Sequence, residues 1–154
     1  MYMVEKLIIA SLQEFFELEC INATKDETKR KLVFPIKRDV KRRVSEQEMR
    51  FLFVDHVEQS GEFHYSIEAP TTKMYKFSGV TPRSGNIDVC LYKDGKPKHL
   101  IEFKALNPGQ KSYTKDFEKL ICDEENLVNY FVQVIENTDK GTIPNIVGKY
   151  KVAI

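Results

Sequence analysis

The sequence contains few residues that bind zinc or form disulfides. Its three cysteines, Cys20, Cys90 and Cys122, are an odd number and have no C-x-x-C spacing. This pattern favours reduced thiols in a cytosolic protein over a disulfide framework. Cys90 lies inside an apolar run and is interpreted as a small core residue. The three histidines are far apart in the chain, which argues against a zinc site.

Long hydrophobic runs are also absent. No apolar stretch approaches the roughly 20 residues that a transmembrane helix needs. The N-terminal segment carries four glutamates where a signal peptide would have a basic flank and a clean apolar run. We therefore expect this segment to be a helix of the mature protein, and the protein to be cytoplasmic and not bound to a membrane.

The composition is that of a globular protein. The 154 residues are 42% hydrophobic and 31% charged, with no repeats, low-complexity tracts or linker. This length is enough for one hydrophobic core. We predict a single domain over residues 1–154, in which an N-terminal helix and basic loop (1–44) precede the core (45–136) and a C-terminal helix (137–154).

Local patterns predict mixed helices and strands. Residues 3–19 have the apolar spacing of an amphipathic helix. A second helix is expected after Ser45, which forms an S-x-x-E capping box with Glu48, and it should end at Gly61. Between these helices we expect a loop over 22–31 and an irregular segment or short edge strand over 31–43. Strands are expected at 63–69, 73–77, 87–92, 99–106 and 129–137, with a turn at 70–72, a loop at 81–86 and a hairpin turn at Asp94-Gly95. Further helices are expected at 111–126 and from 143.

This order of elements predicts the fold class. We expect an α/β protein, a three-layer sandwich with a central mixed β-sheet of about four to five strands flanked by helices.

One segment of the chain is strongly basic. Residues 29–43 contain eight basic residues, Lys41, Arg42 and Arg43 among them, and a single acid, Asp39. Such a run is a fair footprint for a polyanion such as a nucleic-acid backbone. A solvated loop and helix start explain the same run equally well.

The helix expected at 111–126 carries a second basic pattern. Lys111, Lys115 and Lys119 are spaced i, i+4, i+8, so they should line one helical face. Solvation is the usual explanation for such a stripe, but its position just after the 99–106 strand suggests contact with backbone phosphates.

The most informative segment is the hairpin over residues 85–106. It places Asp88 at the start of one strand, and Glu102 and Lys104 on the partner strand. Side chains alternate along a strand, so Glu102 and Lys104 should share a face while Phe103 packs on the other. Charges on an otherwise apolar strand need a partner, a metal or a functional cleft, because burying them alone is costly.

The residue types suit the hydrolysis of a phosphodiester. Mg²⁺ prefers oxygen ligands and usually keeps several waters, so two carboxylates and a backbone carbonyl suffice to hold it. Asp88 and Glu102 supply the carboxylates, and the Phe103 backbone carbonyl is a candidate third ligand. Lys104 would hold the attacking water or stabilise charge on the phosphate.

Asp88, followed by Glu102-x-Lys104 on the next strand, resembles the motif of the PD-(D/E)xK nuclease superfamily. The superfamily core is a helix, a three-stranded meander, a helix and a further strand, and the order expected over residues 45–136 matches it. The resemblance implies a restriction-endonuclease-like fold and a Mg²⁺ or Mn²⁺ cofactor. It also implies a further acid on the helix before the sheet, for which Glu48 is the best match and Glu58 a weaker one. Ile87 departs from the proline in the family name.

The helix after the ExK strand often bears a polar residue that faces the site in this superfamily. The residues available here are Lys111, Lys115, Asp116 and Lys119.

Each of these residues also has an ordinary structural explanation. Glutamate at the position of Glu48 is common in capping boxes without any catalysis. Asp88 would then simply begin a strand, and Glu102 and Lys104 would form an ion pair on a solvated surface. Against the surface pair, the apolar neighbours of the ExK residues suggest burial on both faces of the strand.

The resemblance leads to two functional hypotheses. The first is a metal-dependent nuclease that hydrolyses phosphodiester bonds, in DNA more than in RNA. The alternative is a catalytically silent nucleic-acid-binding or assembly module. Many members of the superfamily cut both strands as dimers, which leaves a homodimer open. The sequence has no G-x-x-x-x-G-K-[ST], G-x-G-x-x-G or G-x-S-x-G motif, so other phosphate-binding enzymes and serine hydrolases have little support.

Overall fold

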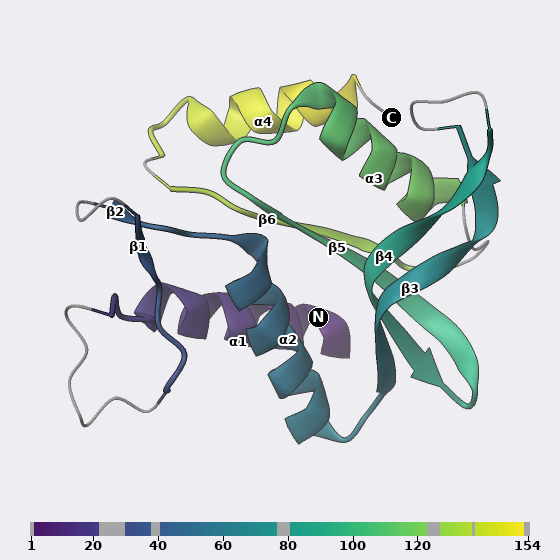
Figure 1. Ribbon diagram of the computed structural model, residues 1–154, viewed down its shortest axis with the longest axis horizontal. Helices are drawn as coiled ribbons and strands as arrows, with labels where there is room; N and C mark the ends of the chain where they lie inside the picture. Colours follow the sequence, from purple (N-terminus) through teal and green to yellow (C-terminus); the bar gives the residue numbers. More distant parts are fainter. Residues whose placement is uncertain are drawn as a thin grey trace. The chain divides into compact units, whose positions relative to one another are not determined.

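The structure is a computed structural model that describes residues 2–21, 30–37, 41–76, 81–122, 127–136 and 138–152. The chain divides into two compact units, Met1–Phe63 and His64–Ile154 (Figure 1). Most of the loop predicted for 22–31 lies outside the described residues, as does the middle of the basic run. Within the described ranges, every helix is too short or too polar to cross a bilayer.

The first unit consists mainly of two helices that pack together, α1 (Met3–Glu17) and α2 (Glu46–Ser60). Two short antiparallel strands, β1 (Ile36–Lys37) and β2 (Lys41–Arg42), lie between them in the chain. This arrangement agrees with the irregular segment or short strand expected there. The buried side chains of the unit include Phe15 and Phe34, whose rings meet edge to face at 5.1 Å.

Both ends of α2 follow the sequence signals. The Ser45 Oγ accepts a hydrogen bond from the Gln47 N–H at 3.3 Å, and the Glu48 Oε2 accepts one from the Ser45 N–H at 3.2 Å. These bonds satisfy N–H groups at the helix start, which have no partner inside the helix. Gly61 ends the helix with φ of 64°, a left-handed conformation that glycine adopts without steric cost. The predicted capping box and stop are confirmed.

The second unit is built on a four-stranded mixed sheet. Strands β3 (His64–Tyr75), β4 (Arg83–Lys93) and β5 (Lys96–Ala105) form an antiparallel meander, and β6 (Tyr130–Val134) pairs with β5 in parallel. The strand order is β3-β4-β5-β6. The chain is therefore α/β, with four helices and one mixed sheet of four strands among the described residues. The predicted mixed sheet is confirmed.

The helices α3 (Gln110–Cys122) and α4 (Thr142–Lys151) lie on one face of this sheet (Figure 1). Aromatic rings join the two helices to β6. The Tyr150 ring on α4 lies 5.2 Å from Phe117 on α3 and 5.4 Å from Phe131 on β6. The Tyr150 hydroxyl donates to the Gln133 Oε1 at 2.6 Å. Because Phe131 and Gln133 are two residues apart on a strand, their side chains share this face.

Two local predictions in the meander are wrong. The turn expected at Pro70–Thr72 is absent, since β3 runs unbroken through it, with an irregular register between Pro70 and Met74. Proline is tolerated there because β3 is at the edge of the four-stranded order, where one side of the strand needs no ladder bond. Most of the loop expected at 81–86 is instead the start of β4, which begins at Arg83. It is held by the Thr71 Oγ1, which accepts the Gly85 N–H at 2.8 Å.

The other hairpin forms as expected. Asp94 and Gly95 have φ of 55° and 71°, the left-handed pair of a type I′ turn, whose twist matches that of the strands. Next to the turn Lys93 lies opposite Lys96, and an irregularity between Tyr92 and Leu91 then shifts the register by one residue, so that Leu91 lies opposite His99 and Val89 opposite Ile101. This register determines where the charged residues of the two strands lie.

Candidate functional site

Asp88 lies where the backbone ladder between β4 and β5 stops. The last paired residues are Val89 and Ile101. One step further, the carboxylate of Asp88 replaces a backbone acceptor, because its Oδ2 accepts the Phe103 N–H at 2.8 Å. Asp88 thus lies in the middle of β4 and not at the start of the strand as predicted, since the strand begins at Arg83.

Glu102 and Lys104 share the face of β5 that α3 covers, as their spacing predicted. The Glu102 Oε1 pairs with the ammonium of Lys119. The Lys104 Nζ lies 3.0 Å from the Asp116 Oδ2. Both partners are on α3. Phe103 lies between them in sequence and is 1% exposed, so the strand is buried on both faces here.

Lys119 has a different position from the one predicted. Its side chain is 5% exposed, its Nζ donates to the Asn86 carbonyl oxygen at 2.7 Å, and it lies 3.0 Å from the Asp116 Oδ1. The expected exposed stripe of three lysines is therefore wrong for Lys119, while Lys111 and Lys115 are exposed. At about 100° per residue, eight residues turn the helix about 80° beyond two full turns, so Lys119 reaches the inner edge of the helix.

We call these five side chains the charge cluster: Asp88, Glu102, Lys104, Asp116 and Lys119. It contains three acids and two bases, all in the second unit. The pKa of Glu102 is raised to about 8, mainly by burial and then by the charges of Asp88 and Asp116, while Lys119 acts in the opposite direction. Asp88 and Asp116 both lie close enough to Glu102 for their charges to disfavour its ionised form.

The charge cluster contains oxygen atoms of the kind that Mg²⁺ and Mn²⁺ prefer as ligands. Asp88 and Glu102 offer carboxylate oxygens, and the Phe103 carbonyl should point towards β4, as its N–H does. The Asp116 Oδ2 is buried and accepts no hydrogen bond from the described residues, although it is ion-paired with Lys104. In the part of the chain that is described, no three His, Cys, Asp or Glu side chains are already arranged around a common metal position.

The predicted site residues outside β4, β5 and α3 all belong to the first unit. Glu48 belongs to the first unit, where its carboxylate bonds both the N–H and the hydroxyl of Ser45. Arg43 is exposed, and the side chains of Lys41 and Arg42 fall outside the described part. A role for these residues in metal or nucleic-acid binding stays a prediction.

Asn86 and Asp116 complete the site. Asn86 contributes a backbone oxygen, which no sequence pattern marks. Asp116 was one of several polar candidates on its helix, but its apolar neighbours in the sequence already indicated that Asp116 is buried. It lies among Tyr113, Phe117 and Leu120, whose i, i+4, i+7 spacing defines the buried face of α3. An acid within an apolar stripe needs a buried partner.

A pocket of about 360 Å³ opens at the carboxyl ends of β5 and β6. Its lining combines apolar and polar side chains: Leu106, Asn107, Ile135, Glu136, Thr142, Asn145 and Ile146. Leu106 follows Lys104 by two residues, so the pocket lies just beyond the end of the ExK strand. The carboxyl ends of parallel strands are a frequent place for ligands in open α/β sheets.

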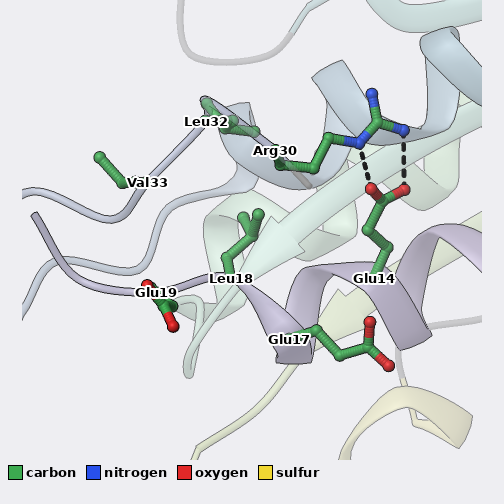
Figure 2. A pocket seen from close by; sticks show the side chains of 7 residues that line it. All are labelled: Glu14, Glu17, Leu18, Glu19, Arg30, Leu32 and Val33. Carbon is green, nitrogen blue, oxygen red and sulfur yellow. Dashed lines mark hydrogen bonds and ion pairs between the residues drawn. The ribbon is translucent and has the colours of Figure 1, made fainter. Parts of the chain in front are cut away.

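The first unit has a separate pocket of about 200 Å³ (Figure 2). Figure 2 shows the Arg30 guanidinium bonded through two nitrogens to the carboxylate of Glu14. A second acid, Asp55, lies 2.6 Å from the Arg30 Nη2. The hydrogen bond from Arg30 is the main cause that lowers the pKa of Glu14. Because Glu17 and Glu19 also line this pocket, its acids outnumber its base, and it is unsuited to a phosphate.

Comparisons with known proteins gave no match: no family profile, no curated protein and no solved structure resembled the chain closely enough to count. The functional assignment therefore depends on the chemistry of the site.

Proposed function

We propose that the protein is a metal-dependent nuclease of the PD-(D/E)xK type, with a restriction-endonuclease-like sandwich fold. The observation that carries the proposal is the meeting of Asp88, Glu102 and Lys104 on adjacent strands, with the carboxylate of Asp88 anchored to the Phe103 N–H. The chain order α2, β3-β4-β5, α3, β6 supports the fold, since it repeats the order of the superfamily core.

Asp88 and Glu102 would hold the metal ion, Mg²⁺ or Mn²⁺, with the Phe103 carbonyl as a further ligand. Bound there, such an ion supplies Lewis-acid chemistry, polarising a phosphoryl oxygen and making a water more acidic. The anchoring of Asp88 matters for this role, because a metal site needs ligands that are held in place by further hydrogen bonds.

Lys104 would act on the substrate. Its side chain is 15% exposed, compared with 2% for Glu102, so of the two ExK side chains it is the one that reaches solvent. In this position its ammonium can donate to the attacking water or to a phosphate oxygen that gains charge. The ion pair with Asp116 holds the ammonium at the end of the strand until the substrate arrives.

Nucleic acid is the substrate class that the surface supports. Lys111 and Lys115 are exposed on α3, the helix that covers the ExK strand. Lysines at such a place contact backbone phosphates without reading sequence. DNA is proposed ahead of RNA because of the superfamily resemblance.

The alternative is a silent module that keeps this fold without cutting. One observation favours it, namely that the carboxylate of Glu102 is already paired with Lys119. In a silent module this pairing would be permanent, and the cluster would only stabilise the fold.

Cleavage assays distinguish the two. Purified protein is incubated with supercoiled plasmid, single-stranded DNA and RNA, in Mg²⁺, Mn²⁺ or EDTA. We expect cutting that needs the metal and falls by at least about 100-fold in Lys104→Ala, the scale of one lost electrostatic group. Lys98→Ala is the matched control, an exposed lysine on the same strand. If folded wild-type protein cuts none of the three substrates with either metal, the silent module is the better account.

A further inference from the structure

The ammonium of Lys119 is surrounded by oxygen atoms inside the charge cluster. Its Nζ donates to the Asn86 carbonyl and the Glu102 Oε1, and it lies 3.0 Å from the Asp116 Oδ1. The three oxygens come from β4, β5 and α3. Lysine is almost never buried to this degree without such partners.

These partners are the hard oxygen atoms that a divalent cation also prefers. A lysine ammonium is a compact point charge with three donors, so it can occupy a position among carboxylates that suits a metal ion. One of its partners, Glu102, is a carboxylate that the proposed nuclease needs for its metal. A divalent ion bound to the Glu102 carboxylate would lie beside the Lys119 ammonium, and the two cations would repel each other.

We propose that Lys119 is a built-in occupant of the metal site, which holds the carboxylates together in the metal-free protein and is displaced from Glu102 when a divalent ion binds. This inference rests on the proposed function, since it concerns the same site. It adds a regulatory property: the affinity for metal is set by how tightly Lys119 is held.

The charges of the cluster explain why an occupant is needed. Three acids face two bases, and Lys104 is paired with the Oδ2 of Asp116. Without Lys119, the buried Glu102 (1% exposed) would lose the ammonium that its Oε1 contacts, with Asp88 and Asp116 nearby. Leaving a buried charge without its partner is strongly destabilising. A divalent ion is the natural replacement, because it brings more charge to the same oxygens.

The decisive variant is Lys119→Gln, which keeps much of the side-chain length and removes the charge. Lys98→Gln is the matched control, with the same change of charge on an exposed lysine of β5. Mn²⁺ and Mg²⁺ affinities are measured by calorimetry on the full chain, and melting temperatures are recorded in EDTA and in Mg²⁺.

We expect Lys119→Gln to bind Mn²⁺ at least about tenfold more tightly than wild type. It should melt earlier in EDTA and recover more stability in Mg²⁺ than wild type, because a ligand stabilises a protein in proportion to the logarithm of its affinity. Lys98→Gln should match wild type in both measurements.

Two other results separate the inference from the proposed function. If wild type binds Mn²⁺ and Lys119→Gln binds it equally or more weakly, Lys119 is a permanent ion pair and the inference is overturned, while the nuclease proposal stands. If neither protein binds Mn²⁺ or Mg²⁺, the proposed metal site is wrong and the inference falls with it.

A measurement on wild type avoids the question of whether the variant folds. A buried ammonium with three oxygen partners exchanges its protons slowly, so its ¹⁵Nζ resonance should be visible in the metal-free protein. Saturating Mg²⁺, which is diamagnetic, should shift or remove this resonance. An unchanged resonance at saturation would show that the ammonium keeps its place and would overturn the inference.

Discussion

The backbone N–H of Phe103 donates to the carboxylate of Asp88 across 2.8 Å, at the point where the ladder between β4 and β5 has ended. A side chain thus performs the task of a backbone carbonyl, and it fixes the orientation of a carboxylate that would otherwise rotate. The same bond places Asp88 beside Glu102, and the negative charge of Asp88 raises the pKa of Glu102. Two acids on adjacent strands are thereby held near each other.

This bond gives a prediction about stability. Asp88→Ala removes the acceptor and leaves the Phe103 N–H without it, which should lower the free energy of unfolding by about 1–3 kcal/mol. Asp88→Asn keeps an acceptor oxygen and should cost much less. Urea unfolding of both variants measures the difference. Equal losses in the two variants would show that the charge of Asp88, and not its hydrogen bond, stabilises the strand pair.

The raised pKa of Glu102 gives a prediction about pH. Burial first, and then the charge of Asp88, raise it from an ordinary 4.5 to about 8 in the folded protein. Because the folded state holds this proton more tightly than the unfolded state, the contribution to stability is complete below pH 4.5. It is lost as the pH rises through about 8.

Metal-free wild type should therefore lose more stability than Glu102→Gln between about pH 5 and pH 8. Urea unfolding in EDTA at several pH values within this window provides the test. Parallel pH profiles for the two proteins would mean that Glu102 titrates with an ordinary pKa.

The capping box of α2 can be tested separately from the charge cluster. Ser45→Ala removes the oxygen that accepts the Gln47 N–H and the hydroxyl that bonds Glu48. The expected loss of stability is about 1 kcal/mol. Thermal or urea unfolding measures it, and Ser84→Ala on the exposed part of β4 serves as the control. A loss no larger than that of the control would show that the box adds nothing.

The elements with strong local signals could be predicted from the sequence. Ser45 and Glu48 marked the start of α2, Gly61 its end, and Asp94-Gly95 the hairpin turn. Glu102 and Lys104 share a face because alternation in a strand depends only on spacing. These features are decided by a few neighbouring residues, so they do not depend on the rest of the fold.

The predictions that were wrong concern features that depend on residues distant in the chain. Pro70 looked like a turn, but pairing with β4 keeps β3 extended through it. Lys119 was predicted to be a surface lysine. It is buried because its ammonium contacts Glu102 and the Asn86 carbonyl, which lie on two different strands facing α3. Sequence spacing shows which helical face a residue is near, but it does not show what lies opposite that face.

The most direct test of the account is Mn²⁺ binding to metal-free protein, with wild type, Asp88→Asn and Glu118→Gln compared by calorimetry. Glu118 is an exposed acid on α3, so its variant has the same change of charge outside the cluster. We predict one bound Mn²⁺ for wild type and Glu118→Gln, and at least about a tenfold loss of affinity, or 1.4 kcal/mol, for Asp88→Asn. Equal affinity for folded Asp88→Asn and wild type would contradict the claim that Asp88 and Glu102 form a metal site.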